Sequence, residues 1–205
     1  MKNIFALLFI ITTLSHAQTE SKYNFNLGAC ITEQEANELE YALSYFESQV
    51  QQRFGNEDLN RAIFSYLESL YVPSEGAYDL DPSLNKEVPK VLEGLKSSGL
   101  FDKIWIPLRE ADPAAVDQNG NPPDKNILVF NADGSFYKCV LASKTSSIIK
   151  RYISYESENP GFNFSFSARF IRRGLEKQEL DNDLNRLVIA LGFYYQFMYS
   201  MNNED

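Results

Sequence analysis

The sequence predicts an α+β domain that is predominantly helical. Three observations predict this class: a long amphipathic helix with a clear start and stop near the N-terminus, an Asp-Gly turn between two β-prone runs, and an almost wholly apolar helix near the C-terminus. We expect an N-terminal helical hairpin, a small antiparallel sheet and a buried C-terminal helix. The composition is globular, because 44% of the residues are hydrophobic and 23% are charged.

Residues 1–17 have the pattern of a cleavable secretory signal peptide. A lysine precedes the apolar run 4–14, and Ser15 and Ala17 place small side chains at the positions that signal peptidase reads. This run is too short for a membrane span, which takes roughly 20 apolar residues. We therefore expect 18–205 to be a single mature domain, secreted or periplasmic, with no stable membrane span.

The N-terminal helical hairpin is predicted from caps and periodicity. Thr32 and Glu35 have the spacing of a capping box, and Gly55 ends the apolar repeat that follows them. A second helix is expected between a cap at Asn56 and Pro73, which cannot continue it.

The middle of the chain is expected to hold a short helix, a buried segment and a loop. Pro89 begins the helix and Gly99 closes it. The apolar segment 101–108 suits either a buried strand or irregular structure, with Trp105 as a core residue rather than a platform for a ligand. The stretch 112–125 is rich in Pro, Asn, Gly and Asp, and it is where the domain would divide if it has two lobes.

Two patterns predict the antiparallel sheet. Asp133 and Gly134, between β-prone runs, indicate a hairpin over 127–141. Phenylalanines that alternate with other residues over 162–170 indicate a strand with one buried face, which would join the hairpin. A helix over 148–153, capped by a preceding serine, lies between these two parts of the sheet.

The apolar stretch 187–201 is expected to form the buried C-terminal helix. It is interrupted mainly by Gln196 and Ser200, so it has no extended polar face. Its aromatic residues, Tyr194, Tyr195, Phe197 and Tyr199, are expected to pack in the core. The alternative is that they line a ligand pocket.

Cys30 and Cys139 are the two cysteines of the chain, and an exported protein meets an oxidising compartment. We therefore predict one disulfide between them. Closing a loop of about 110 residues would stabilise the fold by about 4 to 5 kcal/mol on the chain-entropy model. The alternative is two buried thiols, since spacing alone does not bring two side chains together.

The most informative absence is histidine, because His16 is the only one and it lies in the predicted signal peptide. This excludes histidine-dependent triads and histidine-ligated metals from the mature domain, and no Gly-rich phosphate loop is present. Asp117 begins a pattern like a calcium loop, but Pro122 and Leu128 stand where that loop requires Gly and Glu. The alternative is a weaker calcium site that also recruits Asp124 or Asp112. We predict no cofactor and no metal site.

The mature chain is strongly acidic. The full sequence has 19 basic and 28 acidic residues, a net charge of -9, which becomes -10 without Lys2. Nucleic acid phosphates would be repelled, so no nucleic acid partner is expected. The one dense basic group, Arg169, Arg172, Arg173 and Lys177, is the candidate contact for an anionic ligand or partner. The alternative is a solvated helix face.

By elimination, the sequence predicts an exported, non-catalytic interaction or binding protein whose partner is an unidentified protein or small ligand. We assign no catalytic residue. One alternative is a histidine-free hydrolase of glycan or cell-wall material that uses two carboxylates. The other is an acidic inhibitor of a basic secreted enzyme, since its negative charge would steer the two proteins together.

Overall fold

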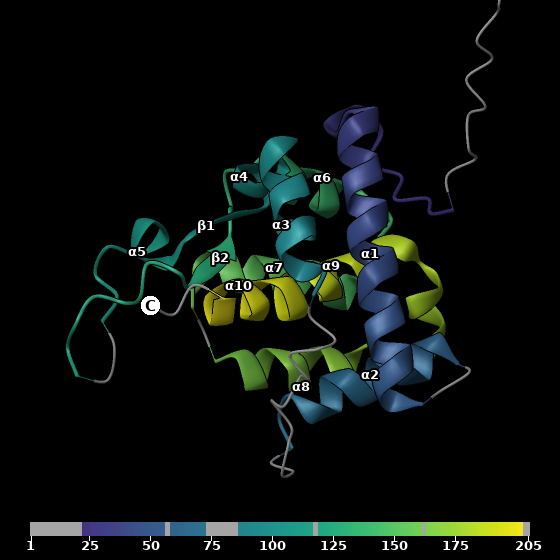
Figure 1. Cartoon of the computed structure of the whole chain (residues 1–205). Coiled ribbons are helices and arrows are strands. Elements are labelled where there is room, and N and C mark those ends of the chain that lie inside the picture. Colours follow the sequence, from purple (N-terminus) through teal and green to yellow (C-terminus); the bar gives the residue numbers. More distant parts are fainter. Residues whose placement is uncertain (1–21, 56–57, 73–85, 117–118, 162, 203–205) are drawn as a thin grey trace, which may run out of the picture.

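The computed structural model describes residues 22–55, 58–72, 86–116, 119–161 and 163–202. The elements follow in the order η1 (Gly28–Cys30), α1 (Glu33–Phe54), α2 (Leu59–Ser69), α3 (Val88–Ser97), α4 (Leu100–Ile104), β1 (Trp105–Pro107), α5 (Leu108–Ala111), β2 (Leu128–Phe130), α6 (Ser135–Ala142), α7 (Ser147–Glu158), α8 (Phe164–Gly174), η3 (Lys177–Asp181), α9 (Asp183–Ile189), η4 (Ala190–Tyr195) and α10 (Gln196–Asn202) (Figure 1). The predicted class, α+β and predominantly helical with a small antiparallel sheet, is confirmed.

Several sequence predictions fall outside the described residues. They are the signal peptide 1–17, the cap at Asn56, the stop at Pro73 and the start of the calcium-like pattern at Asp117. Export and the division into lobes at 112–125 both stay predictions.

Helix α1 begins and ends where the sequence predicts. The Thr32 side chain accepts a hydrogen bond from the Glu35 amide, and the Glu35 side chain accepts one from the Thr32 amide, which completes the capping box. The helix stops at Gly55, whose φ of 57° is left-handed. Asp58 caps α2, which runs across the lower end of α1 in Figure 1.

The strand partners differ from those expected. Strand β2 pairs antiparallel with β1, with Trp105 opposite Phe130, so the segment 101–108 supplies a short helix and then a strand. Trp105 is a core residue, 1% exposed, as predicted.

The predicted hairpin over 127–141 is wrong, because the chain after Asp133-Gly134 forms α6 instead of a second strand. Asn131 donates its amide to the Ile104 carbonyl at the end of α4, and its side chain accepts from the Asp133 amide. Gly134 lies directly against the Lys103 carbonyl, where any side chain would collide. The turn therefore docks on α4 and leads into a helix, and the partner strand comes from earlier in the chain.

The predicted strand over 162–170 is also wrong, and residues 164–174 form α8. Asn163 caps this helix by accepting a hydrogen bond from the Phe166 amide. Ala168 and Ile171 are buried on one face, while Phe166 is 52% exposed. The buried residues of this segment follow the helical period and not the alternation of the phenylalanines, so the segment folds as a helix.

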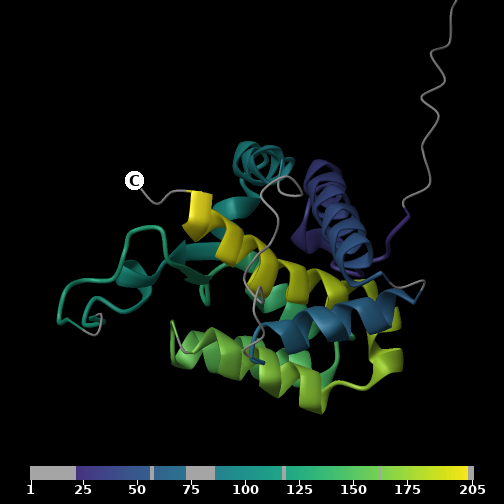
Figure 2. The same cartoon turned by 60° about the horizontal axis from the view of Figure 1, so that its bottom comes forward.

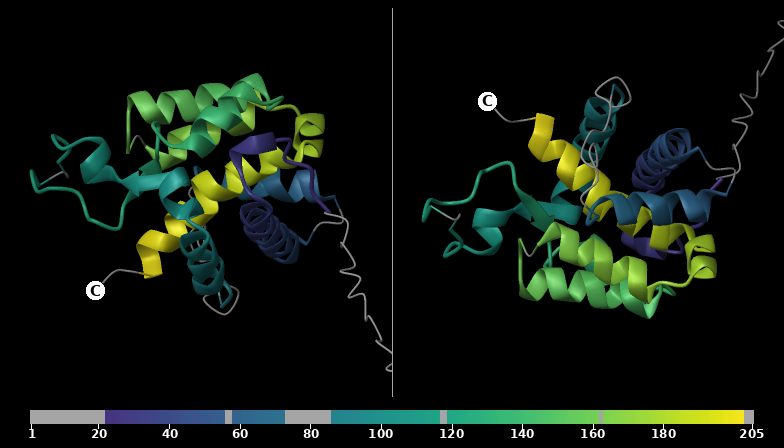
Figure 3. Two further views of the ribbon diagram at one scale, coloured as in Figure 1. Left: turned by 90° about the horizontal axis from the view of Figure 1, so that it is seen from above. Right: turned by 90° about the horizontal axis from the view of Figure 1, so that it is seen from below.

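The C-terminal elements α9, η4 and α10 form one continuous helical rod through the centre of the molecule. Figures 2 and 3 show it running between α7 and α8 on one side and α1 and α3 on the other. Every residue from 184 to 195 is buried, which confirms the predicted buried helix and the core packing of Tyr194 and Tyr195. No helix in the described part of the chain has both the length and the apolarity of a membrane span.

A disulfide and a buried group of hydrogen-bonded side chains join distant parts of the chain. Cys30 and Cys139 form the predicted disulfide, with Cα atoms 6.2 Å apart. The Arg186 guanidinium on α9 donates from Nε to Glu47 Oε1 on α1 over 2.7 Å, and both side chains are buried. The Tyr23 hydroxyl donates to Glu47 Oε2 over 2.8 Å. The carboxylate therefore has a cation and a second donor, as a buried charge requires.

Candidate functional site

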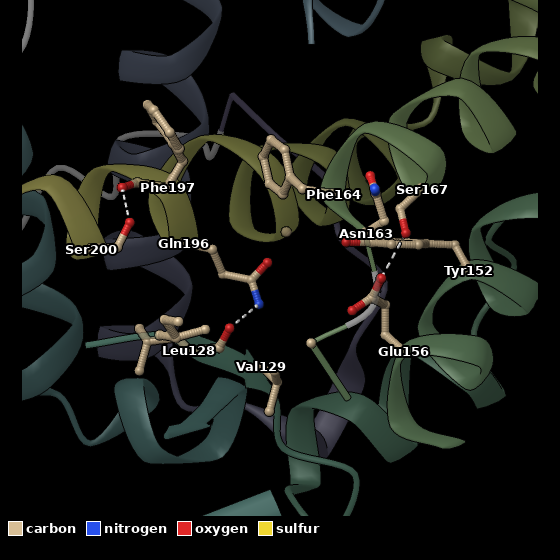
Figure 4. Close-up of a pocket in the computed structure, with 13 residues that line it drawn as sticks. Leu128, Val129, Tyr152, Glu156, Asn163, Phe164, Ser167, Gln196, Phe197 and Ser200 are labelled. Atoms are coloured by element: carbon tan, nitrogen blue, oxygen red, sulfur yellow. Dashed lines mark hydrogen bonds between the residues drawn. The ribbon is translucent and has the colours of Figure 1, made fainter. Parts of the chain in front are cut away.

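A cavity of about 320 Å³ opens between α7, α8, β2 and the C-terminal rod (Figure 4). Its described wall combines apolar side chains with a few polar groups, contributed by Leu128 and Val129 on β2, Tyr152 and Glu156 on α7, Asn163, Phe164 and Ser167 at the start of α8, and Gly192, Gln196, Phe197 and Ser200 on the rod. This combination is typical of a small-molecule site.

Helical spacing brings the key side chains together. Tyr152 and Glu156 lie four residues apart on α7, and Phe164 and Ser167 lie three apart on α8, so each pair shares one helix face. The two helices pack against each other, and these faces meet at the cavity.

Glu156 is the chemically distinctive group of the cavity. It is 7% exposed, and one carboxylate oxygen accepts a hydrogen bond from Ser167 Oγ over 2.7 Å. The other carboxylate oxygen points into the cavity (Figure 4). Burial raises the pKa of Glu156 to about 7, and the hydrogen bond from Ser167 opposes this rise only in part. Among the described lining residues it is the one with a formal charge at neutral pH.

The remaining polar groups make the wall rich in hydrogen-bond acceptors. Gln196 donates its amide hydrogen to the Leu128 carbonyl over 3.2 Å, which leaves its own carbonyl oxygen facing the cavity (Figure 4). Ser200 donates to the Phe197 carbonyl over 2.8 Å. Ser167, Gln196 and Ser200 therefore all donate hydrogen bonds within the protein. The carboxylate oxygen of Glu156 and the amide oxygen of Gln196 that face the cavity suit a ligand that donates hydrogen bonds.

Tyr152 is held across the cavity by close packing. Its ring stacks on Phe193 with centroids 5.1 Å apart, and burial raises the pKa of its hydroxyl well above the ordinary value, so it stays protonated. Gly192, in the π-helical segment η4, makes room for that hydroxyl, because a Cβ there would collide with it and lie 3.0 Å from the Phe130 ring. Single-turn π-helical segments are frequent at functional sites.

The structure divides the predicted basic group between two places. Arg172 donates from Nε to Glu68 Oε1 over 2.7 Å and lies over the Phe64 ring, and Lys177 pairs with Asp58. These two side chains fasten α8 and η3 to α2. Arg169 and Arg173 lie on another face of α8 and are exposed. None of the four lines the Glu156 cavity.

Sequence reasoning missed Glu156 and Ser167. The available signal was the position of Glu156 on the apolar face of α7, which also carries Ile149, Tyr152 and Ile153. A carboxylate within such a stripe predicts a buried acid. Phe197, which the sequence assigned to the core with a ligand pocket as the alternative, lines the cavity.

The described residues offer neither a metal centre nor a pair of catalytic acids at the cavity. No three His, Cys, Asp or Glu side chains among them gather as metal ligands would. A two-carboxylate glycosidase mechanism needs a second carboxyl group about 5 to 9.5 Å from the first, and the described cavity wall has only Glu156.

Comparison of the chain with protein-family models, with curated proteins and with solved structures finds no match in any of the three.

Proposed function

We propose that the mature chain is an exported, non-catalytic binding protein whose ligand is a small organic amine with an apolar body. The observation that carries this proposal is a buried carboxylate, Glu156, that faces an apolar cavity and has no cationic partner among the described residues. A buried charge is stable when it is paired, so a cationic ligand would supply the positive charge that the described residues do not place beside Glu156. The signal-peptide pattern and the disulfide support export.

The ammonium group would donate hydrogen bonds to the open carboxylate oxygen of Glu156 and to the carbonyl oxygen of Gln196. Its apolar body would lie against Phe164, Phe197 and Leu128, which line the same cavity. Phe164 also offers a ring face to a cation. The volume of about 320 Å³ falls within the range of small-molecule sites.

Binding of a cation should depend on the ionisation of Glu156. Its pKa of about 7 in the empty protein means that the carboxyl is largely protonated below neutral pH and must lose a proton to pair with an amine. Affinity should therefore fall about tenfold for each pH unit below 7.

The test is calorimetric titration of the oxidised mature chain with phenethylamine at pH 8 and at pH 6, with phenethyl alcohol as the neutral counterpart. We expect the amine to bind more tightly than the alcohol, and more tightly at pH 8 than at pH 6. The Glu156→Gln variant should lose about tenfold or more in amine affinity, because a hydrogen bond to a charged group is replaced by a neutral one. Glu158→Gln is the matched control, since Glu158 is exposed on the same helix.

Three results would contradict the proposal. Equal affinity for amine and alcohol would show that the cavity recognises only the apolar body. Unchanged amine affinity in Glu156→Gln would place the amine elsewhere on the protein. An absence of amine binding at millimolar concentration would rule out small organic amines as the ligand.

A further inference from the structure

A second concave surface lies along the outer side of the pair α7 and α8. It consists of two adjoining hollows of about 230 Å³ and about 390 Å³, which share Arg151, Phe166 and Phe170. Tyr155 borders the smaller hollow, and Arg169 and Arg173 border the larger one. We call this surface the Arg–Phe groove.

Helical spacing makes the groove continuous. Phe166, Arg169, Phe170 and Arg173 recur at steps of three and four on α8, so they form one stripe along that helix. Arg151 stands on the facing side of α7 and lies over the Phe170 ring at 5.3 Å. The stripe from 166 to 173 is about 10 Å long, at 1.5 Å of rise per residue.

The floor of the groove is apolar and open to solvent. Phe166 is 52% exposed and Tyr155 is 38% exposed, although most large apolar side chains of the described chain are buried. The lining of the two hollows contains no carboxylate among the described residues.

The charge of the groove contrasts with the rest of the protein. Arg151, Arg169 and Arg173 make no ion pair with any described residue, whereas the neighbouring Arg172 pairs with Glu68. The full chain has a net charge of -9. Three guanidinium groups beside an apolar floor are therefore a local exception in an acidic molecule.

We propose that the Arg–Phe groove binds a small amphipathic anion, an apolar chain or ring that ends in a carboxylate or a phosphate monoester. The guanidinium group is a planar fork of donors that matches both head groups, and the phenylalanine floor receives the apolar part. The larger hollow, about 390 Å³, has the size of a small-molecule site, and it adjoins the smaller one through the three residues that they share, which suits an extended ligand.

This site is separate from the amine cavity. Tyr152 and Ser167 border both that cavity and the smaller hollow, but the arginines line the groove alone and Glu156 lines the cavity alone. The inference therefore does not depend on the proposed function.

The test is titration of the oxidised mature chain with octanoate, octyl phosphate and octanol. We expect both anions to bind more tightly than octanol, with affinity that falls as salt rises, and the tighter anion identifies the preferred head group. The double variant Arg169→Gln with Arg173→Gln should weaken anion binding about tenfold or more, the loss expected when charge-assisted hydrogen bonds are removed.

Two controls make the test specific. Arg61→Gln with Arg109→Gln removes the same charge at exposed positions away from the groove, and it should leave anion affinity within about twofold, because only screened long-range charge is changed. Glu156→Gln should bind the anions like the unchanged chain. Phe166→Gln tests the floor at an exposed position and should weaken all three ligands.

Any of three outcomes would overturn the inference. They are equal binding of octanol and the anions, equal losses in the two double variants, and no anion binding at millimolar concentration. Circular dichroism of each variant would confirm that the arginine substitutions leave the fold intact.

Discussion

Replacing Glu156 by glutamine tests whether burial of this carboxyl group opposes folding at neutral pH. Glutamine has nearly the same shape, and its carbonyl oxygen can still accept the hydrogen bond that Ser167 Oγ donates over 2.7 Å. The substitution therefore removes only the ability of the side chain to ionise.

The magnitude follows from the pKa. Burial raises the pKa of Glu156 from 4.5 to about 7 in the folded protein, while the unfolded chain keeps a value near 4.5. The folded state therefore holds the proton more tightly, so the contribution to stability is largest below pH 4.5 and is lost as pH rises to about 7. The full difference is about 3 kcal/mol, of which about 2.5 kcal/mol falls between pH 5 and pH 8.

Urea unfolding of both chains at pH 5 and pH 8, with the disulfide intact, measures this effect. The free energy of unfolding of Glu156→Gln should exceed that of the unchanged chain by about 2.5 kcal/mol more at pH 8 than at pH 5. Other titrating groups are common to both chains and cancel in this comparison. An equal gain from Glu156→Gln at both pH values would refute the reasoning, because it would mean that the carboxyl titrates like an exposed one.

Three further substitutions test the core. Arg186→Met removes the cation from the buried Glu47 carboxylate and should lower the free energy of unfolding in urea by about 3 to 5 kcal/mol, with part of that loss recovered when Glu47→Gln is added. Gly192→Ala places a methyl group against the Tyr152 hydroxyl at the cavity wall. It should lower the free energy of unfolding in urea by about 1 to 3 kcal/mol and weaken amine binding. Exchange of Cys30 and Cys139 for serine opens a loop with a sequence separation of 109 and should lower the free energy of unfolding by about 2 to 5 kcal/mol, whereas reducing agent should then have no effect.

The sequence predicts best those elements whose signals are local. Thr32, Glu35 and Gly55 set the ends of α1 through groups within one turn of each end, so no distant residue changes the outcome. The disulfide was predictable from the presence of two cysteines in a chain whose first residues predict export.

The sheet was not predictable in detail, because its pairing is long-range. Trp105 pairs with Phe130 across 25 positions, and nothing near either residue specifies that partner. The Asp133-Gly134 turn is compatible with a hairpin or with entry into a helix, and contact of Gly134 with the Lys103 carbonyl decides between them. That contact exists only in the folded chain.

The candidate sites were visible in part. The sequence identified a dense basic group, but the structure separates Arg172, which pairs with Glu68, from Arg169 and Arg173, which border the groove. The sequence predicts a strand over 162–170, which includes Arg169 but neither Arg172 nor Arg173, so no single predicted element orders the three side chains. Arg151 belongs to the same groove but comes from another helix, so linear clustering could not include it.

The pair α7 and α8 carries two surfaces of opposite charge. Among the described residues no ion pair joins Glu156 to Arg151 or Arg169, so these arginines do not act as its counter-charge. The arginines are thus free to neutralise an external anion, and the carboxylate is free to pair with a cation in the cavity. If both proposals hold, an amine and an amphipathic anion should bind the same molecule without competing, and saturation with octanoate should leave the affinity for phenethylamine unchanged. A ligand that displaces both would instead show that Tyr152 and Ser167, which border both spaces, couple them.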